Sequence, residues 1–119
     1  MSYTVTHTKA VKLIRSINAE RIIIVSCRPE RIPIKEIGKM CAKEYNTLNE
    51  VHDITDPGIY VGKYMSASSL YEYLNEDAGW YVLIFWVFRD IPEPDLIDQS
   101  DMFDKYAQVF NNKFITVLV

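Results

Sequence analysis

The strongest structural signal in the chain is the stretch Arg21–Cys27, which reads RIIIVSC. Four β-branched residues follow one another without a polar residue between them, and Pro29 comes shortly afterwards. A strand with one face in water alternates between apolar and polar residues, whereas a strand inside a parallel sheet is buried on both faces. The stretch therefore predicts a central strand of a parallel sheet.

Strand and helix patterns alternate on both sides of this stretch. Residues 3–6 predict a short strand, and the apolar residues of 10–17 recur at helical spacing. Downstream, the sequence predicts helices near 33–45, 69–75 and 103–110 and strands near 59–64, 80–88 and 113–119. Five strands alternating with four helices indicate a Rossmann-like α/β fold of three layers, a mainly parallel five-stranded sheet with helices on both faces. A ferredoxin-like α+β arrangement is the alternative, and a further element could lie in the connection 46–58.

The size and composition of the chain fit one domain over residues 1–119. With 119 residues, 49% of them hydrophobic, it can close one core without disulfides or a metal. Cys27 and Cys41 have no metal or redox spacing, so we expect free thiols. We expect a cytoplasmic protein, because the sequence shows no signal peptide and no apolar run of roughly 20 residues. The net charge of −3 argues against general DNA binding.

Polar and basic residues follow each of the first four predicted strands. In an open α/β sheet, ligands bind beyond the carboxyl ends of the strands, where helix N-termini offer N–H donors to an anion. The residues at these positions are Thr6, His7 and Thr8, then Ser26, Cys27 and Arg28, then Lys63, Met65 and Ser66, then Arg89 and Asp90. Each one alone is more often a helix cap or a solvated charge. Together they predict a site for a phosphate-bearing ligand.

Several catalytic motifs are absent from the sequence. Pro33 stands where a Cys-x5-Arg phosphatase loop starting at Cys27 would need arginine, and there is no P-loop or GxGxxG. Four potential metal ligands lie between Glu50 and Asp56, but ordinary polar loops have the same composition, and we interpret this one as solvated. The sequence predicts neither a metal nor a cofactor.

A set of short segments occurs in a characteristic order. These segments are Val5-Thr6-His7 before a helix, Pro57-Gly58, a strand through Val61-Gly62, Met65-Ser66-Ala67, the strand 80–88, and Met102 before a last helix and strand. Their order resembles that of the small CARF-like ring nucleases of type III CRISPR systems, over roughly the first ten and the last sixty residues. The family has an arginine at the position of Thr6 and a proline at that of Ser66.

The resemblance implies a CARF-like fold, a homodimer, and the binding or cleavage of cyclic oligoadenylate. In this class the ribose 2′-hydroxyl attacks the neighbouring phosphate and leaves a 2′,3′-cyclic phosphate, and no metal is needed. His7 is the candidate for proton transfer, since an imidazole titrates near neutrality. The other expected site residues are Arg28, Lys63 and Arg89 on the phosphates, with Thr6, Thr8, Ser26, Met65 and Ser66 around the ligand. A two-fold dimer would present the same pocket to each half of a symmetric ring.

A non-catalytic role is the competing hypothesis. The chain could be a sensor that binds the nucleotide without cutting it, or a protein-interaction domain. Exposed Trp80, Tyr81, Trp86 or Phe88 would favour an interaction domain, but a central strand buries such residues more simply, and we expect burial. At this point cleavage and binding without cleavage both stay open.

Overall fold

Strands and helices alternate along the residues that the computed structural model describes, which are 2–74, 80–91, 99–110 and 114–119. The strands are β1 (Ser2–Thr4), β2 (Arg21–Ser26), β3 (Tyr45–Thr47), β4 (Gly58–Lys63), β5 (Tyr81–Val87) and β6 (Phe114–Leu118). The helices are α1 (His7–Ile17), α2 (Ile34–Cys41), α3 (Ala67–Tyr73) and α5 (Gln99–Val109), with short 3-10 turns η1 (Pro29–Arg31) and η2 (Leu48–Glu50).

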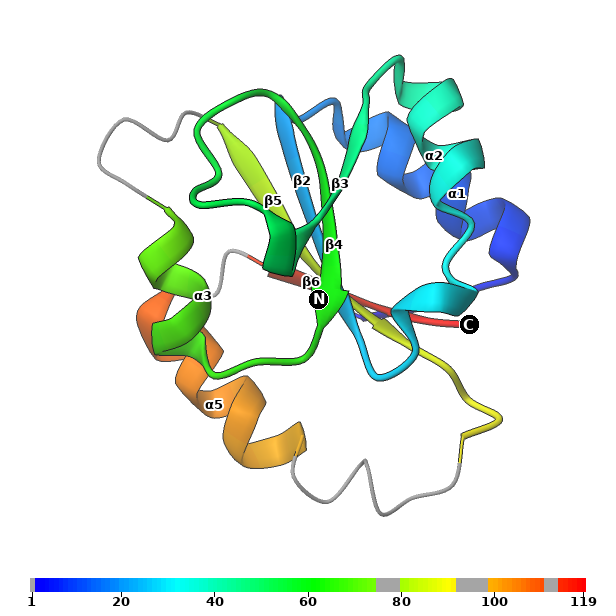
Figure 1. The fold of residues 1–119 in the computed structure, drawn as a ribbon. Coiled ribbons are helices and arrows are strands. Elements are labelled where there is room, and N and C mark those ends of the chain that lie inside the picture. Colours follow the sequence, from blue (N-terminus) through cyan, green and yellow to red (C-terminus); the bar gives the residue numbers. More distant parts are fainter. Residues whose placement is uncertain (1, 75–79, 92–98, 111–113) are drawn as a thin grey trace.

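The strands form one sheet in the order β1-β6-β5-β2-β4-β3, and every neighbouring pair is parallel. Helices α1 and α2 cover one face of this sheet, and α3 and α5 cover the other (Figure 1). The chain first runs from β1 through β2 to β3 with its helices on one face, and then returns through β4 and β5 to β6 with its helices on the other. The predicted three-layer α/β fold is confirmed.

Strand β2 lies in the middle of the sheet, between β5 and β4. All six of its residues are buried. Ile22 and Ile24 belong to the core under α1 and α2, whereas Ile23 and Val25 belong to the core under α3 and α5. The unbroken apolar stretch is thus the result of a strand that faces two cores at once.

Strand β5 and the residues that flank it are rich in aromatic side chains. Trp86 and Phe88 are buried in the core under α1 and α2, as expected, and Tyr81 is half-buried. The expectation of burial is wrong for Trp80, which is 57% exposed. Trp80 precedes the first residue of β5, so no neighbouring strand flanks it in the way that β2 and β6 flank Trp86.

The sheet has one strand more than predicted, because β3 occupies its edge beside β4. Helix α2 ends at Cys41, and Ala42 takes a left-handed conformation with φ of 53° that turns the chain towards this strand. Tyr45, which the sequence placed in the helix near 33–45, lies in β3 and is 48% exposed. A three-residue edge strand has no buried face, so its sequence has no apolar pattern from which it could be predicted.

No helix in the described ranges has the length and apolar character needed to cross a membrane.

Candidate functional site

The carboxyl ends of the strands share one edge of the molecule, because all strand pairs are parallel. This strand-end edge holds the residues that follow β1, β2, β4 and β5. The predicted gathering of His7, Arg28, Lys63 and Arg89 along one edge therefore agrees with the sheet topology. The predicted site residues fall into two groups, because some lie on the α1–α2 face of the sheet and others on the α3–α5 face.

His7 is the first residue of α1 and lies on the α1–α2 face of the sheet. Thr6 caps the helix, since its Oγ1 accepts a hydrogen bond of 3.3 Å from the backbone N–H of Lys9, and the first turn contains no acidic residue. The His7 ring is exposed, with its centroid 5.9 Å from that of Trp86 and 6.1 Å from that of Phe88. Two buried rings thus support one side of an imidazole that solvent can reach.

Arg31 and Asp90 form an ion pair beside His7. The Asp90 carboxylate accepts hydrogen bonds from both terminal nitrogens of Arg31, at 3.2 and 3.0 Å. The Arg31 guanidinium also lies over the Phe88 ring, with its Cζ 4.2 Å from the ring centroid. Hydrogen bonds from Arg31 lower the pKa of Asp90, and the nearby His7 lowers it further. The edge therefore holds a carboxylate that stays charged near neutrality and lies close to the imidazole.

The turn after β2 uses two of the predicted ligand-binding residues for its own structure. Ser26 is fully buried, and its Oγ accepts a 3.3 Å hydrogen bond from the backbone N–H of Arg28. The exposed Arg28 side chain donates back to the carbonyl of Cys27 at 3.0 Å. The Ser26 hydroxyl thus shapes the turn, while Arg28 contributes an exposed cation.

Lys63 lies on the same face of the sheet as this turn. It pairs in register with Ser26 and follows Ile59 and Val61, which point into the α1–α2 core, so alternation directs Lys63 to that face. Lys63 in β4 lies two strands away from Trp86 in β5. Because neighbouring strands are about 4.8 Å apart, the two residues are separated by roughly 10 Å. Thr8, Lys63 and Arg89 are exposed. The backbone N–H of Arg89 donates to the carbonyl of Val119 at 3.0 Å.

Met65 and Ser66 belong to the opposite face, because they lead into α3. The carbonyl of Met65 accepts a 2.5 Å hydrogen bond from the hydroxyl of Tyr106 in α5. Ser66 is the N-cap of α3, and its Oγ accepts a 3.2 Å hydrogen bond from the N–H of Ser69. These two predicted residues therefore do not join the group around His7.

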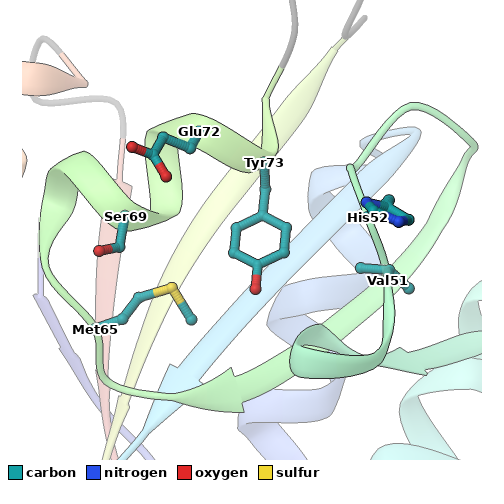
Figure 2. A pocket seen from close by; sticks show the side chains of 6 residues that line it. All are labelled: Val51, His52, Met65, Ser69, Glu72 and Tyr73. Atoms are coloured by element: carbon teal, nitrogen blue, oxygen red, sulfur yellow. The ribbon is translucent and has the colours of Figure 1, made fainter.

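A pocket of about 420 Å³ lies between α3 and the loop after η2 (Figure 2). Its lining residues are Val51, His52, Met65, Ser69, Glu72 and Tyr73. The predicted start of this helix at residue 69 is wrong, because α3 begins at Ala67, with Ser66 as its cap. Ser69 and Glu72 are instead on the body of the helix, one turn apart, where both can line a pocket.

The polar loop before β4 does not assemble a metal site. No group of three or more histidine, cysteine, aspartate or glutamate side chains in the described ranges could hold a metal ion. Cys27 is buried, Cys41 is half-buried, and both are free thiols, as expected. Burial raises the pKa of the Cys41 thiol above its ordinary value.

The ion pair that lies beside His7 was not predicted from the sequence. Arg31 lies in a stretch without a recognisable pattern, and its partner Asp90 is 59 residues away along the chain. The only available signal was the position of Asp90 just after the aromatic strand. Such a pair depends on how η1 folds back over Phe88, which spacing alone does not reveal.

Comparisons of the chain with protein-family models, with curated proteins and with solved structures find no match.

Proposed function

We propose that the protein binds cyclic oligoadenylate at the strand-end edge and cleaves it without a metal. The observation that supports this most is the arrangement around His7, an exposed imidazole backed by Trp86 and Phe88 and placed close to the Arg31–Asp90 pair. An imidazole that is fixed on one side and open on the other is suited to proton transfer with a bound ligand. The choice of cyclic oligoadenylate as the ligand comes from the resemblance to ring nucleases.

The surroundings of His7 favour an anionic ligand. Helix α1 points its N-terminus at the strand-end edge, and its first turn carries Lys9 but no acid. The exposed cations Arg28, Lys63 and Arg89 lie on the same edge, at or just after the ends of β2, β4 and β5. A helix N-terminus and several cations together attract phosphate.

Trp86 adds a second feature that favours a ligand beside His7. Its indole Nε1–H is buried and has no hydrogen-bond partner among the described residues. Buried donors are nearly always paired, so an unpaired one next to a candidate site suggests a bound water or ligand atom.

Cleavage would proceed by an internal transfer within the ligand. His7 accepts the proton of a ribose 2′-hydroxyl, whose oxygen then bonds to the adjacent phosphorus while the bond from phosphorus to the 5′-oxygen breaks. The 5′-oxygen takes a proton from solvent, and the product carries a 2′,3′-cyclic phosphate. Arg28, Lys63 and backbone N–H groups would stabilise the charge that develops on the phosphate oxygens. Asp90 would place a negative charge near the positive charge that forms on the imidazole in this step.

Binding can be tested separately from cleavage by titrating cyclic tetra- and hexa-adenylate into charge variants. Lys63→Ala and Arg28→Ala should each weaken binding several-fold and leave the fold intact, because both side chains are exposed. Lys39→Ala in the last turn of α2 is the matched control and should bind like the native chain. Binding should also weaken as salt is raised. Equal affinities for all three variants would remove these cations from the site.

A sensor that binds without cleaving is the second candidate. The arrangement of His7, Asp90 and Arg31 favours the enzyme, because a sensor needs no exposed imidazole beside a charged carboxylate. Incubating the native protein with the same rings and resolving the products by chromatography separates the two. An intact ring after saturating binding would favour the sensor.

A further inference from the structure

The pocket in Figure 2 lies on the opposite face of the sheet from His7. Val51, Met65 and Tyr73 pack against the core that contains Leu70, whereas the His7 ring contacts Trp86 of the other core. The proposed cleavage step uses none of the pocket's side chains. The pocket is therefore a second candidate site with a chemistry of its own.

The walls of the pocket are tied together by a backbone hydrogen bond. The N–H of Ile54, which is fully buried, donates to the carbonyl of Tyr73 at 2.8 Å. This bond joins the loop that carries Val51 and His52 to the end of α3. The pocket is thus formed by two segments that are held in place without a ligand.

The polar groups of the pocket do not suit a phosphate. None of the six lining residues is lysine or arginine, and Glu72 contributes a carboxylate. Ser69, Tyr73 and His52 contribute two hydroxyls and an imidazole, each of which can donate and accept hydrogen bonds. The Oγ of Ser69 accepts a 2.7 Å hydrogen bond from the hydroxyl of Ser66, which leaves its own proton to donate. These groups favour a neutral ligand that carries both donors and acceptors.

The apolar groups of the pocket favour a flat ligand. In Figure 2, the Tyr73 ring extends from the end of α3 between Met65 on one side and Val51 and His52 on the other. Aromatic rings and a thioether provide stacking and edge contacts for a heteroaromatic ring. The volume of about 420 Å³ lies within the range of about 300–1,000 Å³ that is usual for small organic ligands.

We propose that this pocket binds a purine base that carries an exocyclic amino group. The amino group donates to the Glu72 carboxylate, and the ring nitrogens accept from the hydroxyls or the imidazole. The base has two possible sources. It is either a base of the oligoadenylate whose phosphates bind at the strand-end edge, in which case this part rests on the proposed function, or a separate purine nucleoside.

Titration of adenosine and guanosine into ¹⁵N-labelled protein tests the proposal without any phosphate. At least one nucleoside should shift the backbone amide signals of Val51, His52, Ser69, Glu72 and Tyr73 in a saturable way. The signals of His7, Arg31 and Asp90 should stay in place. Ethylammonium is the control for a cation that is attracted to the Glu72 carboxylate alone. The proposal would be overturned if ethylammonium gave saturable shifts and neither nucleoside did, or if a millimolar nucleoside gave no shifts.

A pair of glutamate variants tests the role assigned to the carboxylate. Glu72→Ala should weaken nucleoside binding by about tenfold or more, since hydrogen bonds to a charged group contribute strongly. Glu36→Ala removes an exposed glutamate from α2, on the other face, and should leave the affinity unchanged. Equal affinities for the two variants would overturn the assignment of Glu72. Both side chains are exposed, so both proteins should fold.

The source of the base follows from a competition between cyclic tetra-adenylate and the nucleoside. If the pocket holds a base of the messenger, Glu72→Ala weakens the binding of both, and the nucleoside competes with the ring. If the pocket serves a separate nucleoside, only nucleoside binding falls and the two ligands bind together. Failure of the ring to bind at all would contradict the proposed function, while the nucleoside titration would still decide the purine pocket.

Discussion

The Arg31–Asp90 pair is the residue-scale feature on which the candidate site depends. It places a charged carboxylate near His7, and it holds η1 over the Phe88 ring. Both side chains are substantially exposed, so we expect the pair to act mainly by positioning charge and little through stability.

The Asp90 carboxyl should titrate below its ordinary pKa of 3.8, because Arg31 stabilises its charged form. Arg31→Gln should raise this pKa towards the ordinary value, whereas Arg15→Gln in the last turn of α1 should not. Since the folded-state pKa is the lower one, the stabilising contribution is present above the unfolded-state pKa and is lost as the pH falls through the folded-state pKa. An NMR titration of the carboxyl carbon measures the shift. An identical pKa in native protein and Arg31→Gln would contradict the pair.

The hydroxyl of Tyr106 should stabilise the junction between α3 and α5. Tyr106 is fully buried and donates to the carbonyl of Met65. Burial raises the pKa of this phenol, so it stays protonated and remains a donor well into the alkaline range. Tyr106→Phe should lower the free energy of unfolding by about 1–2 kcal/mol in a denaturant titration. Tyr45→Phe, at a residue 48% exposed, is the control, and equal stabilities of the two variants would contradict the assignment.

At the scale of elements, the two threonines at the start of α1 have different roles. Thr6 caps the helix, and Thr8 lies exposed in its first turn. Thr6→Ala should lower the free energy of unfolding by about 1 kcal/mol, whereas Thr8→Ala should change it by less than about 0.5 kcal/mol. Denaturant titrations of the two variants measure the difference. Equal losses would show that the cap does not form as described.

The elements that sequence patterns predicted well are those with buried faces. Strand β2 was placed to within one residue, and the end of α1 was placed at Ile17, because their apolar residues must face a core. The start of α1 at His7 lies three residues before the predicted apolar stretch. Strand β3 was missed because it pairs on one side only and buries little. The start of α3 was misplaced because Ser66 and Ser69 are both of a residue type that can cap a helix, and Ser66 is the one whose Oγ accepts the backbone N–H of Ser69.

At the scale of the whole molecule, parallel topology explains why part of the candidate site could be predicted. Once the strands are known to be parallel, the positions of His7, Arg28 and Lys63 at one edge follow. The division between two faces does not follow from strand ends alone, so Met65 was grouped with residues on the other side of the sheet. The Arg31–Asp90 contact does not follow from the strand ends either, because it depends on the path of a loop.

The resemblance and the symmetry of a cyclic ligand predict a homodimer with both strand-end edges turned towards the two-fold axis. Light scattering at micromolar concentration should give the mass of two chains. Lys39→Ala, which alters an exposed residue in the last turn of α2, should give the same mass. A monomer at that concentration would count against a ring shared between two subunits.

The rate of ring cleavage by His7→Ala decides whether His7 transfers the proton. Native protein and His7→Ala are incubated with cyclic tetra-adenylate in the presence of a chelator, and the linear products are measured over time. If His7 transfers the proton, the variant should cut about 100-fold to 10,000-fold more slowly while it binds the ring with near-native affinity. A variant that cuts at the native rate would contradict the assignment of His7, and so would a native protein that binds the ring but never cuts it.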